Sequence, residues 1–475
     1  MGHIMENRFF ALTSLALVAS MLFVTDTFAA PLQRTFVASY GNDANPCSRA
    51  TPCRGFTAAV AQTTPGGEVI VLDSAGYGPV TITQSVSIVA PPGIYAGISV
   101  ITPGSDGIAV NGGAIDVVLS GLSIVGLGGS SGINMMAART LRIDRCMISS
   151  MIGAGIKAMA SGGTLTVSNT EVRGNGSGIV ANGTLVAQVD HTHIVDSGAQ
   201  GVAVFYGATM QLSNSIISSS GNNGIVLQSG AGTPVRASIT DTRIDHSHSY
   251  GIALYAPVAS STVQISLSDV SVTDSQLEGI DAQASAAGGS ISIDGRGVTS
   301  KYNHQGGIVL AASSGGSCEA VFADSAIADN LTIGLGLNAV NGGTIRAVIS
   351  SSQLRGNGSG VQLNESGAAQ TFAKLAISRS VIARNGTGVL AQSDGGGGTS
   401  YVSVTDSEIS DNFGDGIAVQ GVGGNAIAQR NTITGNGVVG LHIYTGGIIA
   451  TGADNASRDN KGGDVIGTLT PLTFY

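Results

Sequence analysis

The chain carries two carboxylates, Glu278 and Asp281, close together beside an apolar stretch. Two carboxylates next to a groove act as general acid and general base when their environments separate their pKa values. Scattered loop charges are the commoner role for such residues. Surface solvation is therefore the favoured interpretation, and catalysis by this pair is the alternative. We group Arg243, His246 and His248, from the preceding repeat, with the two acids.

Four other side chains, Phe205, Gln228, Tyr255 and Gln283, occupy one position of a repeated motif. Each is the fourth residue after the glycine that opens its repeat. Sugars bind to amides and aromatic faces in shallow grooves. Stacked amides also hydrogen-bond one another as a purely structural ladder, and both interpretations stay open. These four residues are the ligand-binding candidates.

The repeat consists of Gly-Ile or Gly-Val pairs that begin at positions 155, 178, 201 and 224, a constant step of 23 residues. Each pair opens a short apolar strand, and an alternating strand such as 164–167 follows. A period of 20–50 residues built from strands indicates a stacked solenoid. We therefore predict an all-β, parallel β-helix with three strands per coil. Stacking of the coils places Ile156, Ile179, Val202 and Ile225 in one inward column.

Beyond position 224 the repeats become longer, and the added residues follow the Gly-Ile strand. They lie at 256–259, 284–289, 311–316 and 394–398. Insertions in repeat proteins collect on one face, which is often the working face. The loops near the Gly-Ile strands are therefore expected to border the functional surface.

Three recurring features make the chain resemble the right-handed parallel β-helix proteins of the pectin-lyase-like superfamily. They are the Gly-Ile-x-apolar strands, corner pairs such as Asn169-Thr170 and Asp241-Thr242, and an asparagine before the next strand, as at Asn385. The resemblance covers roughly residues 68–475. It implies a substrate groove along the Gly-Ile strand face, walled by the inserted loops. The catalytic motifs of pectate lyases, polygalacturonases, pectin esterases and alginate epimerases do not appear in the sequence.

The column of Asn and Asp residues at the corner is not interpreted as a metal site. These residue types tolerate the left-handed backbone of a sharp corner, which every coil needs. No metal ligands are assigned and no cofactor is expected. A bridging calcium ion enters only if the substrate is an acidic polysaccharide. The Asn-x-Ser/Thr matches, such as Asn330, Asn357 and Asn385, arise from the same corners and need not mean glycosylation.

The chain is divided by composition into four parts. Residues 1–29 are expected to form a signal peptide, because a basic flank precedes a short apolar run and small residues follow it. Residues 30–67 are expected to form an N-terminal cap with a Cys47–Cys53 disulfide and a helix over 54–63. The coils span 68–450, and 451–475 closes the far end. Cys146 and Cys318 are expected to be buried thiols.

Charged residues make up only 11% of the chain and the formal net charge is −9, which disfavours nucleic acid as a partner. No segment of the mature chain is apolar enough to span a membrane. We expect a secreted or periplasmic protein that binds an extended polysaccharide or cell-surface glycan, or presents a rigid surface, along its strand face. The alternative is an enzyme, a polysaccharide lyase, hydrolase or epimerase, with its groove on the Gly-Ile face.

Overall fold

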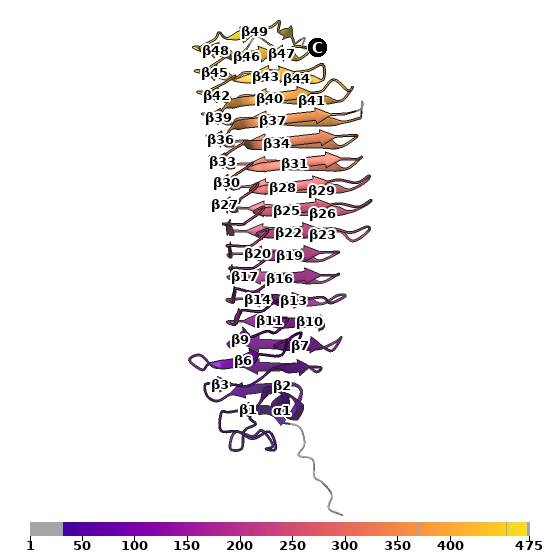
Figure 1. Ribbon diagram of the computed structural model, residues 1–475, viewed down its shortest axis with the longest axis vertical. Helices are drawn as coiled ribbons and strands as arrows, with labels where there is room; N and C mark the ends of the chain where they lie inside the picture. Colours follow the sequence, from indigo (N-terminus) through magenta and orange to yellow (C-terminus); the bar gives the residue numbers. More distant parts are fainter. Residues whose placement is uncertain (1–31, 368–369, 453, 473–475) are drawn as a thin grey trace, which may run out of the picture.

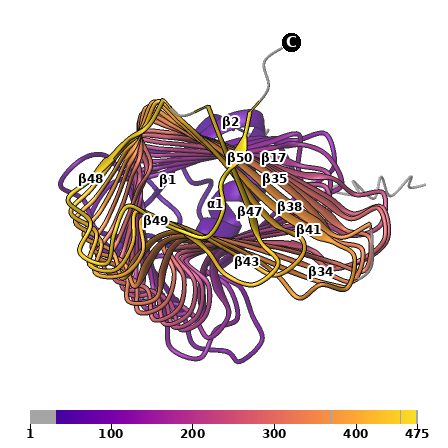
Figure 2. The same cartoon turned by 90° about the horizontal axis from the view of Figure 1, so that it is seen from above.

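The computed structural model describes residues 32–367, 370–452 and 454–472. Their strands wind into a rod of stacked coils, with the N-terminal coils at one end and the C-terminal coils at the other (Figure 1). Seen along the rod, successive coils superpose and enclose one core (Figure 2). The all-β solenoid with three strands per coil is thereby confirmed. The signal peptide predicted for residues 1–29 lies outside the described residues.

Successive coils contribute one strand to each of three parallel sheets, and β1 and β50 at the two ends add a strand to one sheet only. Sheet 1 holds the Gly-Ile strands: β4 (Val80–Ile82), β7 (Ile108–Asn111), β10 (Ile133–Ala137), β13 (Ala154–Ala158), β16 (Ser177–Asn182), β19 (Val202–Phe205), β22 (Ile225–Gln228), β25 (Ile252–Ala256), β28 (Ile280–Ala284), β31 (Ile308–Ser313), β34 (Ile333–Val340), β37 (Ser359–Ser366), β40 (Thr387–Ser393), β43 (Ile417–Gln420), β46 (Leu441–Ile443) and β49 (Val465–Ile466).

Sheet 2 follows the inserted loops: β1 (Leu32–Val37), β2 (Thr63–Val71), β5 (Val86–Val89), β8 (Asp116–Ser120), β11 (Thr140–Asp144), β14 (Thr164–Ser168), β17 (Val186–Asp190), β20 (Thr209–Ser213), β23 (Val235–Thr240), β26 (Thr262–Ser268), β29 (Ser290–Arg296), β32 (Ser317–Ala323), β35 (Thr344–Ser350), β38 (Phe372–Ser378), β41 (Thr399–Thr405), β44 (Gly424–Gln429), β47 (Ile448–Thr451) and β50 (Thr470–Pro471).

Sheet 3 consists of short strands: β3 (Ala75–Gly76), β6 (Ala96–Val100), β9 (Leu122–Gly126), β12 (Met147–Ser149), β15 (Glu171–Arg173), β18 (His193–Val195), β21 (Ile216–Ser218), β24 (Arg243–Asp245), β27 (Ser271–Thr273), β30 (Thr299–Lys301), β33 (Ala326–Ala328), β36 (Gln353–Arg355), β39 (Val381–Ala383), β42 (Glu408–Ser410), β45 (Thr432–Thr434) and β48 (Ala456–Arg458).

The inward column of sheet 1 has the predicted register. Ile156 pairs with Ile179, Ile179 with Val202, and Val202 with Ile225, and all four side chains are buried. Burying each of them stabilises the fold by roughly 1.5–3 kcal/mol. The residues that alternate with this column point out of the coil, and they form the surface on which the binding candidates lie.

The glycine that precedes this column is required by close packing. At Gly224 an added Cβ would lie 2.5 Å from Cγ2 of Ile244 and 2.7 Å from the carbonyl oxygen of Gly251. Any side chain there would push sheet 1 away from sheet 3 and from the next coil. This contact explains why glycine opens successive repeats.

Asparagines at the turn into sheet 1 form a continuous buried ladder. In each step one Nδ2 donates to the Oδ1 of the asparagine one coil later, at 2.8–3.1 Å. The same Oδ1 accepts the backbone N–H of the asparagine one coil earlier. The ladder consists of Asn303, Asn330, Asn357, Asn385, Asn412, Asn436 and Asn460. Burial in this ladder removes Asn330, Asn357 and Asn385 from glycosylation in the folded chain.

The corner after sheet 2 has the left-handed backbone predicted from the Asx column. Asn169, Asp241, Asp324 and Asp406 have φ values between 46° and 52°. The backbone requirement therefore accounts for this column. In the described part of the chain, no group of three His, Cys, Asp or Glu side chains is arranged to hold a metal ion.

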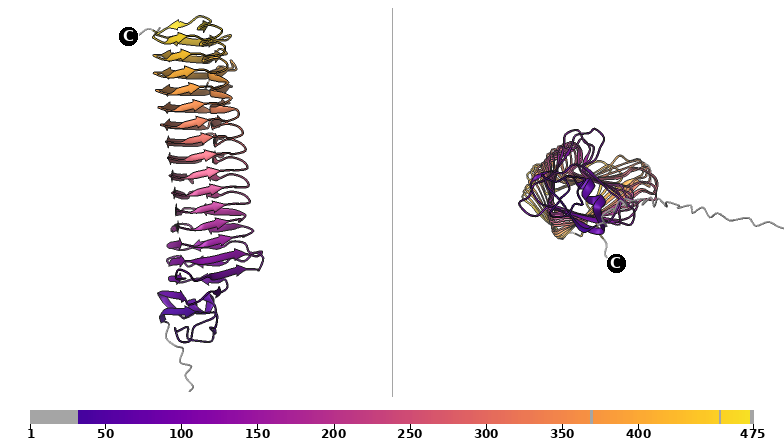
Figure 3. Two further views of the ribbon diagram at one scale, coloured as in Figure 1. Left: turned by 90° about the vertical axis from the view of Figure 1, so that its left-hand side faces the viewer. Right: turned by 90° about the horizontal axis from the view of Figure 1, so that it is seen from below.

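Helix α1 (Phe56–Gln62) lies across the N-terminal end of the coils (Figure 3). Its residues Phe56, Ala59 and Val60 are buried, as its apolar spacing predicts, and Phe56 belongs to the main core. The helix is shorter than predicted at both ends, because Gly55 before it has an extended backbone and β2 already begins at Thr63. Within the described residues, no helix has the length and apolar character needed to cross a bilayer.

The predicted disulfide joins Cys47 and Cys53, whose Cα atoms are 4.6 Å apart, and Cys146 and Cys318 are free and buried as expected. Replacing Cys47 and Cys53 by alanine is expected to destabilise the N-terminal end by about 2 kcal/mol, because the bridge restricts a short loop in the unfolded chain. Faster proteolytic cleavage between residues 38 and 55 would report this loss. A reducing agent should have the same effect on the native chain and none on the double variant. Equal cleavage rates without reductant would contradict the prediction.

Candidate functional site

The four ligand-binding candidates form one column on the outer face of sheet 1. Phe205 pairs with Gln228, Gln228 with Tyr255, and Tyr255 with Gln283, on β19, β22, β25 and β28. Adjacent strands lie about 4.8 Å apart, so the column runs along the rod at one side chain per coil. The structure therefore brings together all four residues that the sequence selected.

Beside this column lies an apolar cluster that is separate from the main core. Its floor consists of Ala203, Val226 and Ala253, which point outward from three successive strands and are nevertheless buried. The half-buried rings of Tyr250 and Tyr255 pack against this floor, together with Val180 and Phe205. The short side chains of Ala203 and Ala253 allow the rings to lie close to the sheet, which creates an aromatic surface on the outer face of sheet 1.

The amides of this column have two different roles along the rod. Between β34 and β37, Asn364 Nδ2 donates to Asn338 Oδ1 at 2.9 Å, and this bond is the purely structural amide ladder. On β22, Gln228 Nε2 instead donates to the hydroxyl of Tyr206 at 3.4 Å. Gln283 Nε2 donates to Asp281 Oδ2 at 2.7 Å. The amide ladder therefore does not extend through the aromatic surface.

The carboxylates of Glu278 and Asp281 lie at the edge of the aromatic surface that is nearer to the C-terminal end of the rod. Asp281 projects outward from β28, in register with Ala253, yet it is only 4% exposed. Burial and, to a smaller extent, the negative charge of Glu278 together raise the pKa of Asp281 to about 7, against the opposing effect of the hydrogen bond from Gln283. Burial also raises the pKa of Glu278. Asp281 is thus a carboxylic acid that holds its proton up to nearly neutral pH.

The same electrostatic field extends to the neighbouring rings. Burial raises the pKa of the Tyr250 and Tyr255 hydroxyls, and the charges of Asp281 and Glu278 raise it further. Both hydroxyls therefore stay protonated and available as hydrogen-bond donors. The two acids and the two tyrosines form one electrostatically coupled group.

A hollow of about 130 Å³ continues the surface beyond Gln283. It opens where the column changes to the small side chain of Ala311, and Asn338 lies on its far side. Ser285 and Ser313, from the inserted loops, form its wall. The insertions thus border the candidate surface, as their position in the repeats predicts.

The basic and imidazole side chains that sequence reasoning grouped with the acids lie elsewhere. Arg243 forms an ion pair with Asp245 on sheet 3, and His246 Nδ1 lies 3.0 Å from the same carboxylate. His248 Nδ1 lies 3.3 Å from the carbonyl oxygen of Ser220. The grouping was wrong for Arg243 and His246, because both pair with Asp245 at the end of β24 on sheet 3.

Sequence reasoning missed a second polar cluster near the C-terminal end of sheet 1. His442 Nδ1 lies 3.0 Å from Oδ2 of Asp415, and the Tyr444 hydroxyl donates to the same oxygen at 3.0 Å. The two rings stack with centroids 3.8 Å apart. These three residues occupy the repeat positions of Glu278, Asp281 and Gln283, so aligning the repeats on their glycines would have placed them on the same face.

The sequence from 96–238 and from 287–460 matches the family model described as right handed beta helix region. No curated protein matches the chain significantly. Similar solved structures include pectate lyase Pel9A, at 16% identity and TM-score 0.44, where the match covers 56% of this chain and 76% of that one.

Two further solved structures are similar to the chain at low identity. The A-module of the mannuronan C-5 epimerase AlgE4 from Azotobacter vinelandii is 13% identical with a TM-score of 0.34, and the match covers 86% of this chain and 91% of that one. The catalytic unit of a GH87 α-1,3-glucanase from Streptomyces thermodiastaticus strain HF3-3 is 14% identical with a TM-score of 0.33. That match covers 88% of this chain and 66% of the glucanase.

Proposed function

The chain belongs to the right-handed β-helix family, and we propose that it binds an extended carbohydrate along the outer face of sheet 1. The single observation that carries this proposal is the aromatic surface of Phe205, Tyr250 and Tyr255 over its own apolar floor. Rings held in this way offer flat apolar faces to sugars, and the flanking amides offer hydrogen bonds. Because equivalent positions recur at each coil, a linear polymer along the rod meets the same kind of contact repeatedly.

The proposed setting is outside the cytoplasm, either secreted or periplasmic. A disulfide at the N-terminal end supports this placement, because such bridges persist in oxidising compartments. For a neutral glycan no cofactor is proposed. For an acidic glycan, a calcium ion would bridge polymer carboxylates to the protein, and binding would then be sensitive to a chelator.

A second function, catalysis on the bound glycan, is favoured by one specific observation. Asp281 keeps its proton up to about pH 7 and lies beside Glu278, whose pKa is raised by burial. A protonated carboxyl group beside a second carboxylate is the arrangement that donates a proton to a leaving oxygen in glycoside chemistry. In this second proposal Asp281 acts as the general acid and Glu278 as its partner.

Replacing Tyr255 by alanine is expected to weaken glycan binding about tenfold, because a half-buried aromatic contact contributes roughly 1.5 kcal/mol. Binding would be measured on a panel that contains polygalacturonate, mannuronan, α-1,3-glucan and cello-oligosaccharides, with and without calcium. Tyr302→Ala is the matched control, because Tyr302 is an exposed tyrosine at the end of a sheet 3 strand. Equal binding by both variants, or no binding of any glycan by the native chain, would refute the binding proposal.

Product formation on the same panel separates binding from catalysis. If the native chain turns over a glycan, Asp281→Asn and Glu278→Gln are each expected to lower the rate at least about a hundredfold while binding is retained. Binding by the native chain without any product would refute the catalytic proposal and leave the binding proposal intact. Turnover that persists in both variants would place the chemistry outside this pair.

A further inference from the structure

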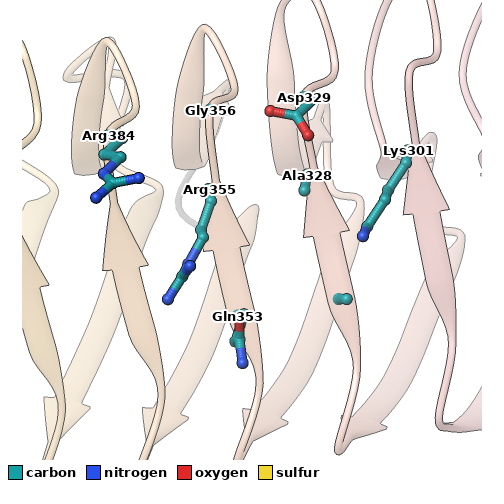
Figure 4. Close-up of a pocket in the computed structure, with 8 residues that line it drawn as sticks. Lys301, Ala328, Asp329, Gln353, Arg355, Gly356 and Arg384 are labelled. Carbon is teal, nitrogen blue, oxygen red and sulfur yellow. The ribbon is translucent and has the colours of Figure 1, made fainter.

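A basic hollow lies on the outer face of sheet 3, away from the aromatic surface. It has a volume of about 330 Å³ and is lined by side chains from β30, β33, β36 and the residue after β39. Figure 4 shows Lys301, Arg355 and Arg384 around it, with Asp329 and Gln353 between them. Three cations and one carboxylate thus share one concave surface, in a chain whose net charge is −9.

The depth of the hollow follows from the register of sheet 3. Lys301 pairs with Ala328 and Ala328 with Arg355, so a long cation alternates with alanine along this column. Ala326 provides a second small residue beside Ala328. Strands one coil apart are separated by about 4.8 Å, so the stems of Lys301 and Arg355 stand about 9.6 Å apart. That gap accommodates one small oxyanion above the alanine floor.

The cations of the hollow are not neutralised by the protein. Among the described residues, none of Lys301, Arg355 and Arg384 forms an ion pair with a carboxylate, whereas Arg296 and Arg430 each do. Asp329 is the one acid on the lining, and it leans over Gly356, where an added Cβ would lie 2.3 Å from its Oδ1. The hollow therefore carries an excess of positive charge that is open to a ligand.

We propose that this hollow binds a tetrahedral oxyanion, a sulfate or phosphate group. Arg355 and Arg384 offer planar guanidinium forks that suit the oxygen pairs of such groups, and Lys301 adds a compact charge from the opposite side. The source of the group is either a free ion or an ester on a larger molecule. The site is independent of the aromatic surface, because it lies on a different sheet.

Equilibrium dialysis at low salt, with radiolabelled inorganic sulfate and phosphate, tests the site directly. We expect one ion per chain, and an affinity at least about tenfold lower in the Arg355→Gln/Arg384→Gln double variant. Arg430→Gln is the matched control, because its arginine already pairs with Asp406, and it should bind as the native chain does. Asp329→Asn should bind several-fold more tightly, since it removes the one negative charge on the lining.

Glucose 6-sulfate and glucose 6-phosphate form the second arm of the experiment. Tighter binding of an ester than of the matching free ion identifies an ester as the source, and equal binding identifies the free ion. Circular dichroism establishes that each variant is folded. Absence of binding by the native chain to all four probes, or unchanged affinity in the double variant, would overturn the proposal, as would weaker binding by Asp329→Asn.

Discussion

Replacing Asp281 by asparagine is expected to increase the free energy of unfolding at pH 8 by up to about 4 kcal/mol and to change it little at pH 4. The folded-state pKa of about 7 lies above the ordinary value of 3.8, so the folded chain binds the extra proton between these pH values. The stability of the native chain therefore falls as pH rises through this window. Asparagine resembles the protonated acid, and it removes the cost of ionising a buried group.

Urea-unfolding midpoints of the two proteins at pH 4 and pH 8 would measure this difference. Asp241→Asn is the matched control, because Asp241 is an exposed corner residue whose left-handed backbone asparagine tolerates. Its effect should be the same at both pH values. An Asp281→Asn protein that is no more stable than the native chain at pH 8 would show that the carboxylate is solvated.

Replacing Asn385 by leucine is expected to lower the free energy of unfolding by about 3 kcal/mol or more. Asn385 is fully buried, and its Nδ2 donates to the carbonyl oxygen of Leu354 at 3.0 Å and to Asn412 Oδ1 at 3.1 Å. Its Oδ1 accepts the backbone N–H and the Nδ2 of Asn357. Leucine would leave several of these groups buried without partners, at about 1–3 kcal/mol for each.

A solenoid unfolds locally as well as globally, so the test needs two measurements. The denaturation midpoint measures global stability, and amide hydrogen exchange of residues 350–415 measures local opening of the coils around the substitution. The control is Asn364→Leu, since Asn364 belongs to the half-exposed amide ladder on the outside of the coil. Water replaces its lost partners, so a change below about 1 kcal/mol is expected. Equal effects of the two substitutions would mean that the internal ladder is not a main source of stability.

The sequence predicts the coil because the repeat of the Gly-Ile pairs determines which strands stack on one another. The step between Gly-Ile pairs aligns Ile156 with Ile179 and Val202, and alternation within each strand then determines which side chains point out. These relations are local and repeat many times, so no long-range information is needed. The column of Phe205, Gln228, Tyr255 and Gln283 follows from the same register.

Burial of Asp281 could not be predicted in this way. Its position in the strand points outward, and only the coupled group of Tyr250, Tyr255 and Glu278 around it shows how the site excludes water. The grouping of His246 and Arg243 with the acids failed for a related reason. Closeness along the chain does not indicate which of three outer faces a residue occupies.

The cluster of Asp415, His442 and Tyr444 joins two coils, and its hydrogen bonds span 27 and 29 residues of sequence. No motif of adjacent residues marks it. Equivalent repeat positions are the only sequence signal, and they indicate a shared face without showing which side chains meet. Side-chain contacts between coils are therefore the part of the site that requires coordinates.

The most direct test of the binding surface is a crystal structure of the protein with the panel glycan that binds most tightly. We expect sugar rings along the outer face of sheet 1, in contact with Phe205 and Tyr255 and reaching the amide of Gln283. A glycan seated on sheet 2 or sheet 3, with Tyr255 left in solvent, would contradict the proposal.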